Sequence, residues 1–312
     1  MRFLRRPWDL RDADVTPEPF FRDRRRLLGG LAGATTAAAF GLRPAFAEAT
    51  LSAPPNPRFT APEAPTPAAD FGSYNNFYEF GFSKGIARAA QRLPTSPWRI
   101  VVDGACDTPF EIDVGDLLKK VTLEDRITRL RCVEAWSMVI PWTGFPLAEL
   151  VKMAGPKPEA KYLRMETFHD PKVALMQSAP QYPWPYVEGL TIEEAKNDLA
   201  FLAVGAYGKP LDQQNGAPIR LVVPWKYGFK SAKSLVRFTF TAKRPTTFWQ
   251  ELGPREYGFW ANVNPKVSHP RWSQAQERRV GDDARIPTRL YNGYEAEVAG
   301  LYAGLDKEKL FM

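Results

Sequence analysis

The residue with the clearest chemical potential in this sequence is a cysteine at the end of a predicted strand. Residues 126–131 alternate basic with apolar or hydroxyl side chains, as in a half-buried strand, and Cys132 follows directly. The Trp and Pro residues beyond it, within 136–146, indicate an aromatic-walled turn. Arg129 and Arg131 are expected to bias the thiol toward thiolate, the form that attacks electrophiles and binds soft metals. The alternative is one more small, buried hydrophobic residue.

Other chemistries are not favoured by the spacing of the remaining reactive residues. The two cysteines and two histidines are too scattered for a zinc site, and no nucleophile elbow, Walker A loop or dinucleotide-binding glycine motif is present. His169 beside Asp170 is expected to be a surface residue, and His269 to pack or hydrogen-bond locally. Cys106 is expected to be a structural or free thiol. A Cys106–Cys132 disulfide is the alternative in an oxidising compartment.

Several blocks of the sequence resemble one enzyme family. Residues 131–137 and 141–146 resemble the molybdenum-ligating segment of sulfite-oxidase-fold molybdoenzymes. They are most similar to the periplasmic protein-methionine-sulfoxide reductase catalytic subunits. The resemblance continues, in the family's order, through residues 75–80, 214–220, 223–230 and 269–274. It therefore covers essentially all of the chain after residue 70.

The resemblance implies one molybdenum–molybdopterin cofactor (Mo-MPT) per chain and assigns residues to it. Cys132 is the expected molybdenum ligand and catalytic residue, and the pterin dithiolene is expected to hold the metal with it. By resemblance, the family's cofactor-binding positions fall at Asn75, Tyr78, Glu79, Cys132, Thr167, Asn215, Arg220, Ser231, Ala232 and Lys233.

The residue types at these positions match what such a cofactor needs. A soft thiolate suits the metal, while Arg220, Lys233 and the backbone at 231–232 suit the phosphate. Side-chain amides and the Thr167 hydroxyl suit the planar edges of the pterin ring. Ser231 stands where the family usually has glycine, which matters little if the contact is made by the backbone.

The elements that must position these residues are predicted to be short. The 29 prolines and 22 glycines force many turns. Short helices are expected at 114–120 and 145–152, and the aromatic segments 180–187 and 225–229 could wall an open pocket or simply pack. Strands are expected at 98–103, 110–114, 126–131, 162–167, 199–204, 219–223 and 235–241. The prediction is an α+β domain with mixed sheets and many loops, the sulfite-oxidase-like molybdopterin-binding fold.

The N-terminal residues have the composition of an export signal. Arg24 and Arg25 precede a small-residue apolar stretch that ends in Ala-Phe-Ala at Ala47, so 1–47 is predicted to be a twin-arginine signal peptide. Residues 48–70 are predicted to be a Pro-rich linker or surface arm, and 71–312 the molybdopterin-binding catalytic domain. No later segment is long and apolar enough to span a membrane.

The charge distribution argues against nucleic acid as a partner. The net charge is +7, but residues 1–47 hold nine Arg against five acids, which leaves only +3 on the rest of the chain. That is too little for a surface that follows phosphates. Since the twin-arginine route exports folded proteins, it also agrees with a cofactor inserted before export to the periplasm.

These observations together predict an exported molybdopterin oxidoreductase that reduces methionine sulfoxide, free and protein-bound, and so repairs oxidised periplasmic proteins. No haem-attachment or flavin motif is present, so electrons are expected from a partner. The resemblance suggests a membrane haem-b subunit fed by quinol. One alternative is a sulfite-oxidase-like enzyme acting on another small S- or N-oxide. Another is a cofactor-free exported binding protein.

Overall fold

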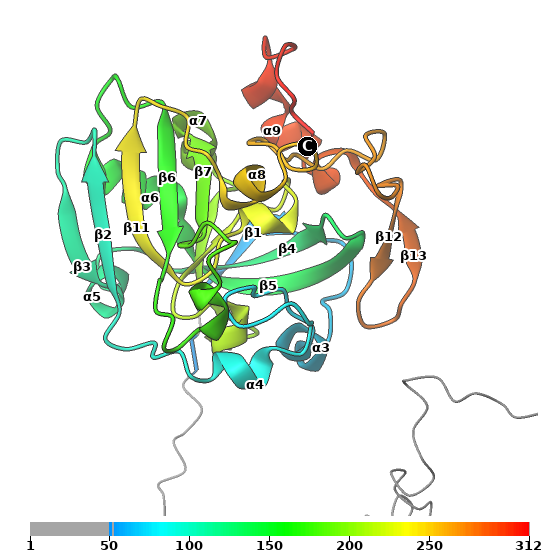
Figure 1. Cartoon of the computed structure of the whole chain (residues 1–312), viewed down its shortest axis with the longest axis horizontal. Coiled ribbons are helices and arrows are strands. Elements are labelled where there is room, and N and C mark those ends of the chain that lie inside the picture. Colours follow the sequence, from blue (N-terminus) through cyan, green and yellow to red (C-terminus); the bar gives the residue numbers. More distant parts are fainter. Residues whose placement is uncertain (1–49, 52, 312) are drawn as a thin grey trace, which may run out of the picture. The chain divides into compact units, whose positions relative to one another are not determined.

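The structure is a computed structural model that describes residues 50–51 and 53–311. The predicted signal peptide, 1–47, lies outside the described residues. The described chain forms two mixed β-sheets joined by short helices and long loops (Figure 1). In this respect the predicted α+β class is confirmed.

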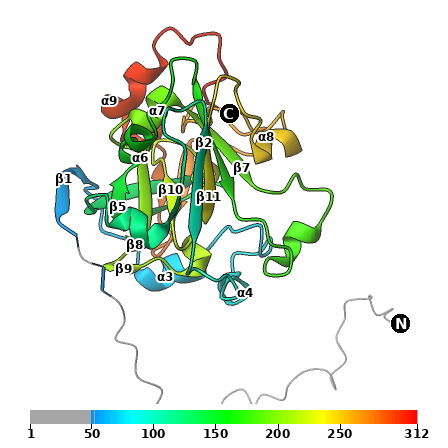
Figure 2. The same ribbon diagram turned by 90° about the vertical axis from the view of Figure 1, so that its left-hand side faces the viewer.

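The smaller sheet has five strands. In spatial order they are β3 (Phe110–Asp113), β2 (Arg99–Gly104), β11 (Leu235–Thr241), β6 (Tyr162–Thr167) and β7 (Val187–Thr191). Only β2 and β11 pair in parallel. Figure 2 shows helices α6 (Leu147–Ala154) and α7 (Ile192–Lys196) on one side of this sheet and α8 (Phe248–Leu252) on the other.

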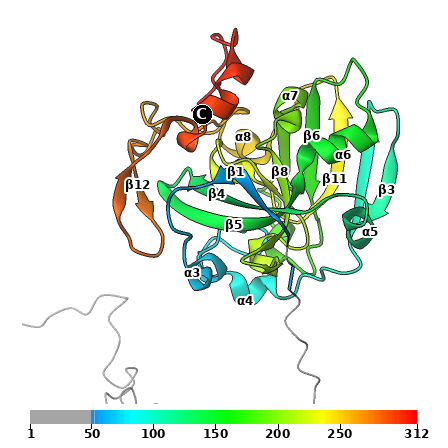
Figure 3. The same ribbon diagram turned by 180° about the vertical axis from the view of Figure 1, so that it is seen from behind.

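The larger sheet has eight strands and carries Cys132. Its main path runs through β1 (Pro55–Thr60), β4 (Glu124–Cys132), β5 (Trp136–Pro146), β12 (Gln276–Arg279) and β13 (Arg285–Pro287). Strand β8 (Phe201–Ala206) pairs with β5 and also with β9 (Lys209–Pro210) and β10 (Arg220–Val222). The long strands β4 and β5 run crosswise to those of the smaller sheet (Figures 1 and 3).

Residues 136–146 are not the predicted turn, because they form β5, the longest strand. Nearly every residue of β5 is buried, so both of its faces are covered and no polar alternation marks it in the sequence. Tryptophan also fits a pleated, buried surface well. The true turn is the three-residue loop 133–135, in which Ala135 has a φ of 61°.

The folded unit also begins earlier than the predicted boundary at Phe71. Strand β1 lies within the predicted linker and pairs in parallel with β4, and helix α3 (Ala68–Ser73) runs across the boundary. Phe59 of β1 is buried under the guanidinium group of Arg126, 4.1 Å from its ring centroid. Prolines do not prevent this arrangement, because an outer strand tolerates missing N–H donors.

The helices are short and their ends follow local sequence signals. Helix α5 (Val114–Leu118) begins after Asp113, whose carboxylate accepts from the Gly115 N–H at 2.8 Å. Helix α6 begins two residues later than predicted and is followed by Gly155 in the left-handed conformation. The others are α4 (Ala87–Ala90) and α9 (Glu295–Val298). No helix in the described part of the chain is long and apolar enough to cross a membrane.

Two apolar clusters form the core. One packs α6 and α7 against the smaller sheet and includes Leu150, Leu163 and Phe238. The other lies on the larger sheet and includes Cys132 and Trp142. The end of β4, including Cys132, is therefore packed in an apolar cluster. This burial affects the pKa of the Cys132 thiol.

Candidate active site

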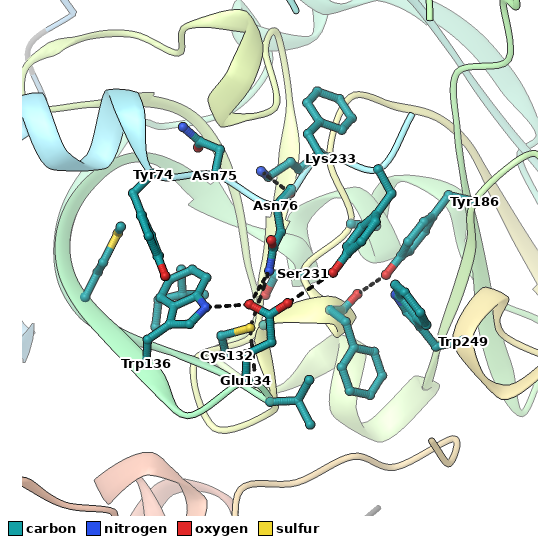
Figure 4. A pocket seen from close by; sticks show the side chains of 18 of the residues that line it. Tyr74, Asn75, Asn76, Cys132, Glu134, Trp136, Tyr186, Ser231, Lys233 and Trp249 are labelled. Atoms are coloured by element: carbon teal, nitrogen blue, oxygen red, sulfur yellow. Dashed lines mark hydrogen bonds between the residues drawn. The ribbon is translucent and has the colours of Figure 1, made fainter. Parts of the chain in front are cut away.

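Cys132 lies on the wall of a cavity of about 480 Å³ that opens to solvent (Figure 4). The wall is built from segment 71–79, the β4–β5 hairpin and the loop at 228–233, and it is completed by Tyr186, Arg220, Trp249, Tyr257, Arg271 and Trp272. These segments are far apart in the sequence. The fold therefore brings together residues that the sequence could only place on separate elements.

Eight of the ten residues predicted to bind the cofactor line this cavity. They are Asn75, Tyr78, Glu79, Cys132, Arg220, Ser231, Ala232 and Lys233. The other two lie directly behind the wall. The Thr167 hydroxyl donates to a Glu79 carboxylate oxygen at 3.2 Å, and the Asn215 amide donates to Asn75 Oδ1 at 3.0 Å.

The Cys132 sulfur is held at the end of a tight hairpin. Cys132 and Trp136 are the last paired residues of β4 and β5, and the Ala135 N–H donates to the Cys132 carbonyl at 3.1 Å. The left-handed Ala135 closes this three-residue loop as a bulge would. The sulfur accepts weak hydrogen bonds from the Glu134 N–H at 3.5 Å and from Asn76 Nδ2 at 3.6 Å.

The prediction that neighbouring arginines bias Cys132 toward thiolate is wrong for the protein without its metal. Burial raises the pKa of the Cys132 thiol to about 12, and the nearby Glu134 carboxylate adds to this. Adjacent residues of a strand point to opposite faces, so Arg131 and Arg129 face away and bind Glu277 at 2.7 and 3.0 Å. A coordinated metal ion would itself deprotonate the thiol.

Glu134 is the main site residue that sequence reasoning missed. Its carboxylate accepts from Trp136 Nε1 at 2.8 Å, Asn76 Nδ2 at 3.2 Å and the Tyr78 hydroxyl at 3.3 Å, and it forms an ion pair with Lys84 (Figure 4). Burial acts to raise its pKa, but these bonds together lower it. Glu134 lies in a recognised sequence block, whereas no signal marked Lys84.

The cavity lined by Cys132 also carries two cations that fit a phosphate, the buried Arg220 and the half-buried Lys233. Arg220 donates to the carbonyls of Asn215 at 2.9 Å and Ser231 at 3.1 Å, and Lys233 Nζ donates to the Asn76 carbonyl at 2.7 Å. Neither has a carboxylate within 4 Å among residues 50–51 and 53–311. Burial lowers the pKa of Arg220 to about 9 and that of Lys233 well below its usual range. An anionic ligand would offset the cost of burying these charges.

Asn215 and Ser231, two further residues predicted to bind the cofactor, differ in whether their polar groups are free to do so. Asn215 Oδ1 is buried without a partner in the described structure, so it can accept from a ring edge. The Ser231 hydroxyl accepts from the Val223 N–H at 3.2 Å, and its own N–H donates to the Gly228 carbonyl at 3.1 Å. Both groups of Ser231 are thus engaged within the protein, and Ala232 follows it along the wall.

Replacing Glu79 with glutamine is expected to stabilise the cofactor-free protein at neutral pH and above. Burial raises the pKa of Glu79 to about 7, so the fold holds a proton that the unfolded chain releases above about 4.5. Wild-type stability therefore falls as pH rises through this window. The gain should grow from near zero at pH 4.5 to about 3 kcal/mol at pH 8 in urea unfolding. An equal effect at both pH values would contradict this assignment.

The aromatic segments are only partly a pocket wall. Tyr186 and Phe229 line the cavity, but Trp225 and Tyr227 are buried in the core. Trp184 lies instead at a second, smaller hollow. About half of the aromatic residues in these two segments therefore have an ordinary packing role.

The remaining reactive residues lie where ordinary packing places them. His269 stacks on Trp272 with ring centroids 3.8 Å apart, as local packing predicted, and His169 is exposed. Cys106 and Cys132 are both free thiols, so the disulfide alternative is wrong.

No group of three His, Cys, Asp or Glu side chains in the described part of the chain is placed to hold a metal. A metal bound to Cys132 would take its other ligands from a cofactor.

Comparison with known proteins agrees with this donor set. Residues 88–249 match the family model described as the oxidoreductase molybdopterin binding domain. The fold and the site thus define a molybdopterin-binding oxidoreductase.

Full-length relatives narrow the class. The chain is 49% identical to a protein of Burkholderia mallei, 50% to one of Pseudomonas syringae pv. tomato and 48% to one of Ralstonia nicotianae, covering 96–97% of this chain and 96% of each relative. All three are named protein-methionine-sulfoxide reductase catalytic subunit MsrP, and the chain belongs to this family. The sulfane dehydrogenase SoxCD of Paracoccus pantotrophus aligns with a TM-score of 0.46 at 19% identity, over 83% of this chain and 67% of that one.

Proposed function

We propose that the enzyme reduces methionine sulfoxide, free and protein-bound, to methionine with Mo-MPT as its cofactor. The observation that carries the proposal is the placement of Cys132 on an open cavity that is also lined by Arg220 and Lys233, two cations without a carboxylate partner among the described residues. The names of the full-length relatives support the substrate class. The reduction consumes two electrons and two protons and releases water.

Different residues of the chain are proposed to bind the metal, the pterin phosphate and the substrate. When bound, Mo-MPT supplies the oxygen-atom transfer. Cys132 is the proposed metal ligand, and Arg220 and Lys233 the proposed partners of the pterin phosphate. Tyr78 and Trp249, whose rings lie 4.9 Å apart on the wall, offer apolar surface to the methyl thioether part of the substrate.

The cavity geometry also suits a substrate attached to a protein. The cavity is open to solvent, and its lining residue Arg271 has a side chain that is 58% exposed. Phe82, which is 49% exposed, packs on the lining residue Tyr78. A side chain can therefore enter while its polypeptide stays outside. This supports repair of oxidised proteins.

The sulfite-oxidase-like alternative requires a different wall. A pocket for a small anion is expected to be ringed by arginine, whereas the wall around Cys132 is mostly aromatic and apolar. Assays of molybdenum-loaded protein decide between the two. The proposal expects reduction of methionine sulfoxide with a reduced dye and little sulfite oxidation, and the reverse would refute it.

We also propose that electrons come from a membrane haem-b partner fed by quinol. The chain has no haem-attachment or flavin motif, so its reduction must come from another redox protein. Reconstitution tests this: quinol should drive the reaction only when the partner is present, while a small reduced dye should drive it without the partner. Quinol-driven turnover by the isolated chain would contradict the proposal.

Export should depend on Arg24 and Arg25. Replacing both with lysine keeps the charge but removes the paired guanidinium groups of the proposed twin-arginine signal. The variant is expected to accumulate in the cytoplasm as a folded, cofactor-loaded precursor, detected by fractionation and molybdenum analysis. Normal delivery to the periplasm, cleaved after Ala47, would show that another route is used.

A further inference from the structure

The carbonyl of Val133, directly after Cys132, accepts hydrogen bonds from two side chains of a distant segment. Trp272 Nε1 and Gln274 Nε2 both donate to it at 2.8 Å. These residues lie about 140 positions further along the chain, before β12. Loop 133–135, which carries the strained Ala135, is thus fastened from outside the hairpin.

Gln274 also contacts the residue before Cys132. Its Oε1 accepts from Arg131 Nη2 at 2.8 Å, while its Nε2 donates to Val133. One amide therefore joins the two neighbours of Cys132, and it is 1% exposed. Arg131 donates to the Cys132 carbonyl as well, and its Nε binds Glu277 at 2.7 Å. A side-chain amide offers both a donor and an acceptor, and Gln274 uses both here.

We propose that Gln274, assisted by Trp272, is a positioning residue that sets where the Cys132 sulfur lies relative to the molybdenum. The inference rests on the proposed role of Cys132 as metal ligand. Gln274 itself does not line the cavity, so it acts through the turn. Groups that orient a metal ligand from behind typically change metal affinity or activity 10–100-fold when removed.

Three substitutions separate the contacts. Gln274→Met keeps the volume but removes both polar ends. Gln274→Glu keeps an acceptor for Arg131 and removes the donor to Val133. Trp272→Phe keeps an aromatic ring at the cavity wall but removes the N–H and reduces the ring from indole to phenyl, a change that the control below shares. The matched control is Trp98→Phe, because Trp98 Nε1 also donates to a backbone carbonyl, that of Leu235, at 2.8 Å in the other core cluster.

The experiment uses full-length protein co-expressed with the cofactor pathway. Molybdenum content, the molybdenum X-ray absorption spectrum, kcat, KM and Tm are measured. We expect all three site variants to keep their molybdenum, to show an altered sulfur shell in the spectrum and to lose kcat about 10–100-fold, with KM within about 2-fold. Trp98→Phe should lower Tm only.

The outcomes that would overturn the inference are distinct. Site variants with lower Tm but a wild-type spectrum and kcat would show that Trp272 and Gln274 only stabilise the fold. An effect of Gln274→Met without one of Gln274→Glu would assign the role to the Arg131 contact instead. If Gln274→Met does not fold, the milder Trp272→Phe decides by the same readouts. Wild-type protein without molybdenum would refute the proposed function rather than the positioning role.

Discussion

Replacing Cys132 with serine is expected to remove nearly all methionine-sulfoxide reductase activity while leaving the fold intact. The substitution exchanges the proposed thiolate ligand for a harder oxygen that ionises less readily. The site has no second thiol to replace it, since Cys106 lies in the other core cluster. The pterin dithiolene and the cations behind it would still anchor the cofactor. Turnover, molybdenum content and the molybdenum spectrum are the measurements.

The matched variant Cys106→Ser separates the possible roles of Cys132. We expect Cys106→Ser to keep its turnover, with at most a modest loss of stability from burying a hydroxyl. If Cys132 were only a buried hydrophobic residue, Cys132→Ser would behave in the same way. Turnover near the wild-type value in Cys132→Ser would rule out the proposed mechanism.

Replacing Lys233 with methionine is expected to weaken cofactor retention about 10–100-fold, because a charge-assisted contact contributes about 1.5–3 kcal/mol. The effect on the cofactor-free protein should have the opposite sign. Burial lowers the pKa of Lys233 well below its usual range, so the cation costs stability until an anion binds. Cofactor-free Lys233→Met should therefore be at least as stable as wild type in urea unfolding. Molybdopterin content after purification measures the first effect.

Lys230 provides the control, because it has a carboxylate partner and is fully buried, whereas Lys233 is half-buried. Its Nζ lies 2.6 Å from Glu188. Lys230→Met would leave that carboxylate buried and unpaired, which costs about 3–5 kcal/mol. We expect this variant to be destabilised with or without cofactor. If Lys233→Met lost as much stability as Lys230→Met and kept its cofactor, Lys233 would be a structural residue.

Much of the sheet framework follows from local sequence. Alternation and turn residues predict β2, β3, β6 and β11 to within one residue. The same reasoning fails for β5, which is buried on both faces and so shows no alternation. It also fails for β1, because its prolines are typical of a linker and its parallel pairing with β4 depends on distant residues.

The sequence could single out candidate site residues, but not the side chains that surround the Cys132 sulfur. Eight of the ten residues that the family-like blocks single out line one cavity in the structure, but the blocks do not show which side chains surround the sulfur. The Lys84–Glu134 pair spans 50 positions, and the Gln274–Val133 bond spans 141. Such contacts depend on how loops cross in space. The error about Arg131 was different, since strand geometry alone turns its side chain away from Cys132.

Strand β1 has a consequence for the exposure of a sheet edge. It lies at the border of the larger sheet and covers β4, which would otherwise present a row of free N–H and C=O groups to other chains. Pro55 and Pro57 lack N–H donors, so β1 is itself a poor template for a further strand. A shortened protein that begins at Phe71 would lack β1. It would expose β4, the strand that ends in Cys132, to edge-to-edge aggregation.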